Sequence, residues 1–121
     1  MKKNGKSHTV MKNSNAMREV INESMSEEEF MAQVIQLLDL CHWRYYHTYR
    51  STRSPAGFPD IAAVRGNSDG SATLIFLEIK KEKGKLTEQQ FEWLSLLNAV
   101  PGVVAMAGRP SDWAAIADML K

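Results

Sequence analysis

The first clear hydrophobic pattern in the chain begins just after residue 25. Apolar residues recur there every three or four positions, at Phe30, Val34, Leu37, Leu38 and Cys41. This spacing places them on one face of a helix that we expect to run from Ser26 to about Leu40. Ser26 and Glu29 form the capping box typical of a helix start, and Met25 with Phe30 can add a hydrophobic staple.

Four later segments have the composition and spacing of β-strands. They are residues 43–49, 60–65, 72–80 and 103–107, rich in aromatic and β-branched side chains. A cluster of Gly, Asn, Ser and Asp at 66–71 predicts that the second and third strands pair as an antiparallel hairpin. Every residue from Leu74 to Leu77 is apolar, which is typical of a central strand with both faces covered.

Two more helices complete the predicted fold. Thr87 and Gln90 form a second capping box, and the helix that follows is expected to carry Phe91, Trp93, Leu94 and Leu97 toward the core. Pro101 and Gly102 end it, and Ser111 is expected to cap a last helix through about Leu120. The order α-β-β-β-α-β-α predicts an α/β fold, a mixed four-stranded sheet flanked by helices on both faces.

Composition adds a domain prediction to this pattern. The 121 residues suit one domain, and 44% hydrophobic with 24% charged residues is ordinary for a globular protein. No segment resembles a membrane span or a signal peptide, so we expect a cytoplasmic protein. Residues 1–25 carry five Lys or Arg against two Glu, a net charge of +3. We interpret 1–25 as a basic flexible extension or partner-dependent arm, and 26–121 as the folded domain.

The candidate chemistry lies at Asp60, Glu78 and Lys80. Side chains alternate along a strand, so Glu78 and Lys80 project from one face while Ile79 packs behind them. The hairpin brings the start of the second strand against the end of the third, so Asp60 is expected beside Glu78. The alternative is a surface ion pair at a strand end, and the surrounding motifs favour a site.

Two adjacent carboxylates predict a divalent cation. Such a pair is tolerated when it is protonated, paired with a cation or bound to a metal. Mg²⁺ or Mn²⁺ suits the pair, because Mg²⁺ takes a few carboxylate oxygens and bridges to substrate phosphate, whereas no Cys/His spacing here fits zinc. Lys80 can then orient or deprotonate the attacking water. Lone Cys41, on the apolar helical stripe, is interpreted as a buried thiol.

These residues resemble a known family. Pro59-Asp60, a hairpin and then Glu78-Ile79-Lys80 resembles the signature of the PD-(D/E)XK nuclease superfamily, and the surroundings resemble its virus-type replication-repair branch, the VRR-NUC domains. The resemblance covers residues from about Ser26 to Trp113, in segments 26–30, Trp43, 46–48, 54–60, 85–87, Gln90, 93–94 and 109–113. It implies a restriction-endonuclease-like core and a DNA endonuclease of a bacterial or phage-infected cell.

The resemblance also implies roles for individual residues. Asp60, Glu78 and the Ile79 carbonyl would hold the metal, Lys80 would be the catalytic lysine, and Glu29 and Gln90 would complete the site. The capping boxes explain Glu29 and Gln90 without catalysis, and Glu28 replaces Glu29 if the helix register differs by one. Flanking residues expected to contact DNA are His47, Arg50, Arg53, Lys81, Lys83 and Lys85.

Several of these residues also have a purely structural explanation. His47 also fits a structural histidine, and the flanking basic residues also fit a solvated loop. Trp43, Trp93 and Trp113 lie on core-facing patterns and are interpreted as packing residues rather than base-stacking ones.

The predicted function is therefore a Mg²⁺- or Mn²⁺-dependent DNA endonuclease. No base-reading module accompanies the domain, which favours recognition of DNA structure over sequence. Stand-alone domains of the branch resemble phage homodimers that act on branched DNA such as four-way (Holliday) junctions, and a two-fold dimer provides two sites for paired cuts. The alternatives are a DNA-binding or assembly module that kept the fold without cleavage, and a protein–protein adaptor.

Overall fold

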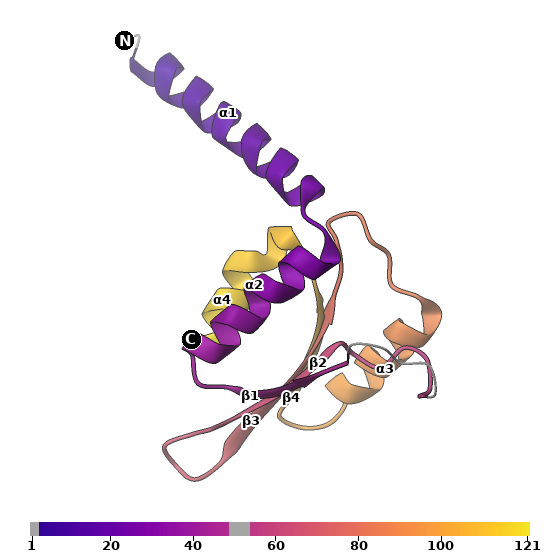
Figure 1. Ribbon diagram of the computed structural model, residues 1–121. Helices are drawn as coiled ribbons and strands as arrows, with labels where there is room; N and C mark the ends of the chain where they lie inside the picture. Colours follow the sequence, from indigo (N-terminus) through magenta and orange to yellow (C-terminus); the bar gives the residue numbers. More distant parts are fainter. Residues whose placement is uncertain (1–2, 49–53) are drawn as a thin grey trace.

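The computed structural model describes residues 3–48 and 54–121, which form one mixed β-sheet with helices on both faces (Figure 1). The elements in chain order are α1 (Lys3–Ser24), α2 (Glu27–Leu40), β1 (Arg44–His47), β2 (Ile61–Gly66), β3 (Ala72–Ile79), α3 (Glu88–Asn98), β4 (Val103–Gly108), the 3₁₀ helix η1 (Pro110–Asp112) and α4 (Trp113–Leu120). The α/β class, the four-stranded mixed sheet and the order of elements from α2 onward are confirmed.

The four strands lie side by side in sequence order. β1 pairs with β2, and β2 with β3, in antiparallel orientation, and β4 runs parallel to β3 after the crossover through α3. The hairpin register sets Ile61 opposite Leu77. Asp60, one residue before β2, therefore lies level with Glu78 near the end of β3.

The main core lies between the sheet and the helix pair α2 and α4. Phe30, Val34 and Leu38 of α2 are buried at the predicted helical spacing. They pack with alternate residues of the central strands, Ile61, Ala63, Ile75, Leu77 and Ile79, and with Ile116 and Leu120 of α4. Trp113 packs its edge on Phe30, with ring centroids 6.3 Å apart, and Trp43 is buried, so both tryptophans pack as predicted.

The opposite face of the sheet carries α3, which packs over β3 and β4. Leu94 of this helix is buried, but Phe91 is 62% exposed, so its predicted core position is wrong. The inward stripe of α3 is Gln90, Trp93, Leu94 and Leu97, at intervals of three and four residues. The helix is rotated to turn Gln90 toward β3, and this rotation turns Phe91 outward.

Residues 1–25 were expected to be a flexible extension or a partner-dependent arm, and residues 3–24 of this segment form helix α1. The helix projects away from the sheet (Figure 1), and its role as an arm remains a prediction. No proline interrupts this segment, so its backbone can continue the helix. The division of domains near residue 26 remains a prediction.

The predicted cap at Ser111 is also wrong. The turn η1 precedes α4, and Ser111 donates its backbone N–H to Oε1 of Glu82 instead of capping. Pro110 starts this tighter turn because its fixed φ suits a first helical position. In the part of the chain that the structure describes, no helix has the length and apolar character needed to cross a membrane.

Candidate active site

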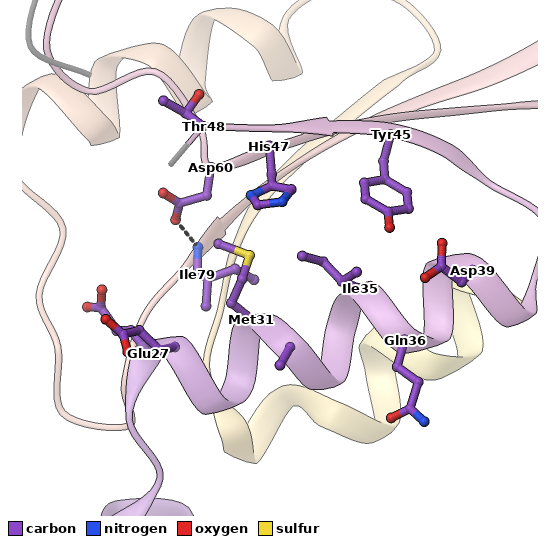
Figure 2. A pocket seen from close by; sticks show the side chains of 12 residues that line it. Glu27, Met31, Ile35, Gln36, Asp39, Tyr45, His47, Thr48, Asp60 and Ile79 are labelled. Atoms are coloured by element: carbon purple, nitrogen blue, oxygen red, sulfur yellow. Dashed lines mark hydrogen bonds between the residues drawn. The ribbon is translucent and has the colours of Figure 1, made fainter. Parts of the chain in front are cut away.

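The hairpin brings the Asp60 carboxylate to the end of β3. Its Oδ2 accepts a hydrogen bond of 2.7 Å from the backbone N–H of Ile79, between Glu78 and Lys80 (Figure 2). Thr48 donates its backbone N–H to the Asp60 carbonyl at 3.2 Å, which extends the pairing of β1 beyond His47. Asp60 is thus held from both neighbouring strands, and the predicted meeting of Asp60 with the Glu78-Ile79-Lys80 segment is present.

Glu78 is a buried carboxyl beside a second acid. Its side chain is only 3% exposed. Burial raises the pKa of Glu78 to about 8, with a further increase from the Asp60 carboxyl and a decrease from the nearby Lys80 ammonium. The pKa of Asp60 is also raised, mainly by burial and against the lowering effect of the Ile79 N–H. Both acids therefore resist ionisation unless a positive charge joins them.

One oxygen of Glu78 lacks a hydrogen-bond partner. Among the described side chains, Oε2 of Glu78 is the buried polar atom without a partner, while Oε1 accepts a 2.9 Å bond from Nε2 of Gln90. An unsatisfied buried carboxylate oxygen is costly, and such an atom in a folded protein calls for an explanation. In the metal-free chain a proton shared with the Asp60 carboxyl can satisfy this oxygen, and a bound cation would take the place of that proton.

Gln90 reaches Glu78 because of the cap of α3. The Thr87 N–H donates to Oε1 of Gln90 at 2.9 Å, and the Gln90 N–H donates to the Thr87 hydroxyl at 3.1 Å. Since the amide oxygen is engaged by the cap, the amide NH₂ is directed at Glu78. The sequence left the capping box and the site contact as alternatives, and Gln90 makes both: its amide oxygen and backbone N–H belong to the cap, and its amide NH₂ contacts Glu78.

A short loop fixes Asp60 against α3. Gly57 has φ +97°, and a Cβ there would lie 2.6 Å from the carbonyl carbon of Gln89. Phe58 packs edge-on against Trp93, with centroids 5.0 Å apart, and Trp93 donates its indole N–H to the Ala56 carbonyl at 3.2 Å. Trp93 is therefore a packing residue, as predicted, but it packs on the Asp60 loop rather than in the main core.

Lys80 leads into a loop that is held by the end of β4, the strand next to β3, and by the residue that follows β4. Its backbone N–H bonds to the Gly108 carbonyl at 3.0 Å, and its side chain is half-buried. The guanidinium of Arg109 donates two bonds, of 3.2 and 2.7 Å, to the Gly84 carbonyl. Arg109 entered the sequence-based expectations only as part of the resemblance, and nothing in local spacing reveals this contact.

The basic residues of this loop lie at the surface. Lys81, Lys83 and Lys85 are exposed, and Lys83 pairs with Glu23 of α1 at 3.3 Å. Their contact with DNA remains a prediction. Arg50 and Arg53 lie outside the described residues.

A groove of about 750 Å³ runs between α2 and β1 and ends at Asp60 and Ile79 (Figure 2). Tyr45 and His47 project from β1 into it, toward Met31 and Ile35 of α2. His47 is half-buried and pairs with Ile61, the residue that follows Asp60. His47 therefore lies near Asp60. Its role, structural or substrate-binding, remains a prediction.

The acidic residue of α2 whose charge acts on Asp60 is Glu27. The charge of Glu27 contributes to the raised pKa of Asp60, and Glu27 and Glu28 line the groove (Figure 2). Glu29 instead accepts the Ser26 N–H in the capping box at 3.2 Å. Glu29 and Glu28 were the sequence-based candidates, and their roles remain predictions; Glu27 was not among them. The first turn of a helix presents each of these side chains in a different direction, and the direction that faces Asp60 is set by the packing of α2.

The donor set fits a hard divalent cation. The described residues contain no cluster of three or more His, Cys, Asp or Glu side chains arranged to hold a metal. Two neighbouring carboxyls and a backbone carbonyl are a small oxygen set, and Mg²⁺ commonly binds through one or two carboxylates with waters and substrate phosphate. The partnerless Oε2 of Glu78 supports this fit.

Comparison with known proteins supports the same family as the motifs. The family model of the VRR-NUC domain matches residues 5–108 of the chain. No curated protein and no solved structure matched.

Proposed function

The chain belongs to the VRR-NUC domain family, a nuclease-type domain, and from this premise we propose that it is a Mg²⁺- or Mn²⁺-dependent DNA endonuclease. The observation that carries the proposal is the pair of neighbouring acids Glu78 and Asp60 at the end of β3, both with raised pKa values and both within reach of the Lys80 charge. Two such acids repel each other when ionised, and a bound cation removes that repulsion.

Each side chain of the site has a role in phosphodiester hydrolysis. Asp60, Glu78 and the Ile79 carbonyl would hold the ion, which when bound neutralises charge on the phosphate and lowers the pKa of water. The Lys80 charge lowers the pKa of both acids, so its ammonium is close enough to orient the attacking water and stabilise the negative charge that develops. Gln90 holds Glu78 in place through Oε1. Glu27 adds negative charge on the α2 side of Asp60.

Metal-dependent cutting tests the proposal. A fluorescently labelled four-way junction is incubated with the protein while Mg²⁺ or Mn²⁺ is titrated, and EDTA is expected to abolish the products. Lys80→Ala should slow cleavage by about 100-fold or more, the size of a lost acid–base or electrostatic group. Lys121→Ala, which removes an exposed lysine paired with Asp118, is the matched control and should cut like the unmodified chain.

Two outcomes would contradict the proposal. DNA binding without metal-dependent cutting would favour a non-catalytic DNA-binding or assembly module. Absence of binding, or an affinity with little salt dependence, would favour a protein–protein adaptor, because contacts to phosphate always depend on salt.

The proposed substrate is branched DNA, cut by a homodimer. A two-fold dimer would present two sites to a four-way junction, as paired cuts require. Single-stranded, duplex, flap and four-way substrates are compared under the same conditions, with the mass of the protein measured by light scattering. Equal cutting of plain duplex and junction would contradict structure selectivity, and a monomer on and off DNA would contradict the dimer.

A further inference from the structure

The face of the sheet that carries α3 is only partly covered. α3 packs over β3 and β4, and no helix within residues 3–48 and 54–121 packs on this face of β1 and β2. We call this surface the open face; its side chains are Arg44, Tyr46, Ala62, Val64 and Leu74. They line a shallow hollow of about 240 Å³, and Tyr46 is 67% exposed. Apolar and aromatic residues gathered at a surface mark an interaction site more often than single exposed ones do.

The strand register connects the open face to the candidate active site. Tyr46 lies opposite Ala62, which lies opposite Phe76, so these three form one row across the sheet. The next row along the strands is that of Asp60 and Glu78, about 7 Å further at two residues per step. Phe58, 41% exposed, packs edge-on against Phe76 at 5.8 Å and stands just before Asp60 in the chain. Aromatic surface therefore extends from the catalytic row onto the open face.

The chemistry of the open face suits nucleobases. Tyr46 offers an aromatic ring, Val64 and Leu74 offer apolar area, and Arg44 supplies a cation. Phe58, outside the open face, adds a second aromatic ring on the side of the active site. None of the side chains of the open face is a carboxylate. The groove on the opposite face of the sheet differs, since Glu27, Glu28 and Asp39 line it and would repel phosphates. A polyanion that approaches the active site is therefore favoured on the open face.

We propose that the open face binds unpaired bases of the DNA strand next to the scissile phosphate, with a base stacked on Tyr46 and a phosphate held by Arg44. This inference rests on the proposed nuclease function and names the part of the substrate that the site selects. Bases in a duplex have their faces covered by neighbouring base pairs, whereas unpaired bases can stack on aromatic side chains whatever their identity. The open face would therefore favour substrates with unpaired nucleotides beside the cut.

Binding to single-stranded DNA without cleavage tests the proposal. Fluorescence anisotropy measures the affinity for an oligothymidine of about 12 nucleotides, a length that spans typical single-strand sites, in buffer with EDTA. Tyr46→Leu should weaken binding by about 5- to 150-fold, the range found when one stacking aromatic is removed, whereas Tyr46→Phe should bind like the unmodified chain. Arg44→Ala should lower the slope of affinity against salt by about one phosphate contact.

Matched controls separate stacking from other effects. Phe91→Leu removes an aromatic of similar exposure from α3, and it should leave the affinity for the oligothymidine unchanged. Circular dichroism and melting temperature establish that each variant folds. Equal binding by Tyr46→Leu and the unmodified chain would overturn the proposal. A change of oligomeric state in Tyr46→Leu, with the DNA affinity unchanged, would overturn it too and would assign the open face to contact between subunits.

The open-face proposal and the nuclease proposal can fail independently of each other. Cleavage that depends on Lys80, with single-strand binding that is indifferent to Tyr46, would leave the nuclease function standing and reject the open face. Single-strand binding that depends on Tyr46, without any metal-dependent cutting, would support the open face as a DNA-binding surface and reject the nuclease.

Discussion

At the scale of single residues, the site depends on two acids that the fold keeps from ionising easily. Glu78 is buried beside Asp60, and both have raised pKa values. A raised pKa means that the folded chain holds a proton which the unfolded chain has already released. Two predictions belong to this scale, one for the protonation of Glu78 and one for its contact with Gln90.

Without metal, the stability of the protein should fall as pH rises. The pKa of Glu78 is about 8 in the folded chain, against 4.5 for an unperturbed glutamate. The stability that this proton contributes is therefore full below pH 4.5, falls as the pH rises, and is lost above about pH 8. Urea unfolding in EDTA, measured at several pH values, checks this. Glu78→Gln should flatten the dependence, because the amide is neutral throughout. Stability that increases with pH across this window would contradict the assigned burial of Glu78.

The two roles of Gln90 can be separated by substitution. Gln90→Glu retains an oxygen for the Thr87 N–H but loses the amide NH₂ that contacts Glu78. It should keep the cap and reduce cleavage by about 10- to 100-fold, the effect typical of removing a partner of a metal ligand. Thr87→Ala, the matched control, should cost about 1 kcal/mol of stability and retain cleavage. Melting temperatures and initial cleavage rates distinguish the two; equal cleavage by both variants would contradict the positioning role.

At the scale of elements, the site is the meeting point of the β2–β3 hairpin, the first turn of α3 and the loop before Asp60. Gly57 allows that loop to touch the backbone of Gln89, next to Gln90. The positions of Asp60 and Gln90 are therefore linked through one close backbone approach. A larger residue at 57 would separate the two halves of the site.

Gly57→Ala should reduce both stability and metal affinity. Its Cβ would meet the Gln89 backbone at 2.6 Å, and its positive φ adds about 1–3 kcal/mol of strain. The matched control is Gly70→Ala, at φ +89° with open space around it, which has the strain without the clash. Thermal unfolding and Mn²⁺ titration calorimetry measure both effects. If Gly57→Ala lowered Mn²⁺ affinity no more than Gly70→Ala did, the loop would have no part in positioning Asp60.

At the scale of the whole molecule, the C-terminal helix closes the core far from the site. The Arg65 guanidinium donates to the carbonyls of Cys41, Leu120 and Lys121 at 2.9–3.0 Å and lies 4.4 Å from the Trp43 ring centroid. Trp43 donates its indole N–H to the same Leu120 carbonyl at 2.9 Å. One arginine thus joins the end of α2, the sheet and the end of α4.

Arg65→Lys should destabilise the fold without changing the chemistry. A single ammonium cannot reproduce the three directed bonds, so unfolding should become easier by at least about 2 kcal/mol. Arg44→Lys, an exposed arginine on the neighbouring strand, should cost far less and serves as the control for urea unfolding. The cleavage rate of folded Arg65→Lys should equal that of the unmodified chain. A large loss of rate at full folding would show that the C-terminal closure shapes the site.

Sequence patterns alone predicted the helices and strands from α2 onward, the hairpin that joins Asp60 to Glu78, and both capping boxes, but not helix α1 or the turn η1. The predicted features follow from periodicity and from contacts within three or four residues, which act the same way in any tertiary context. The tertiary structure decided what depends on how helices rotate and pack on the sheet. That includes the influence of the Glu27 charge on Asp60, the outward turn of Phe91, the burial of Glu78, and the open face beside the row of Asp60 and Glu78. Local spacing says which residues share a helix face, but the direction of that face is set by packing between residues distant in the chain.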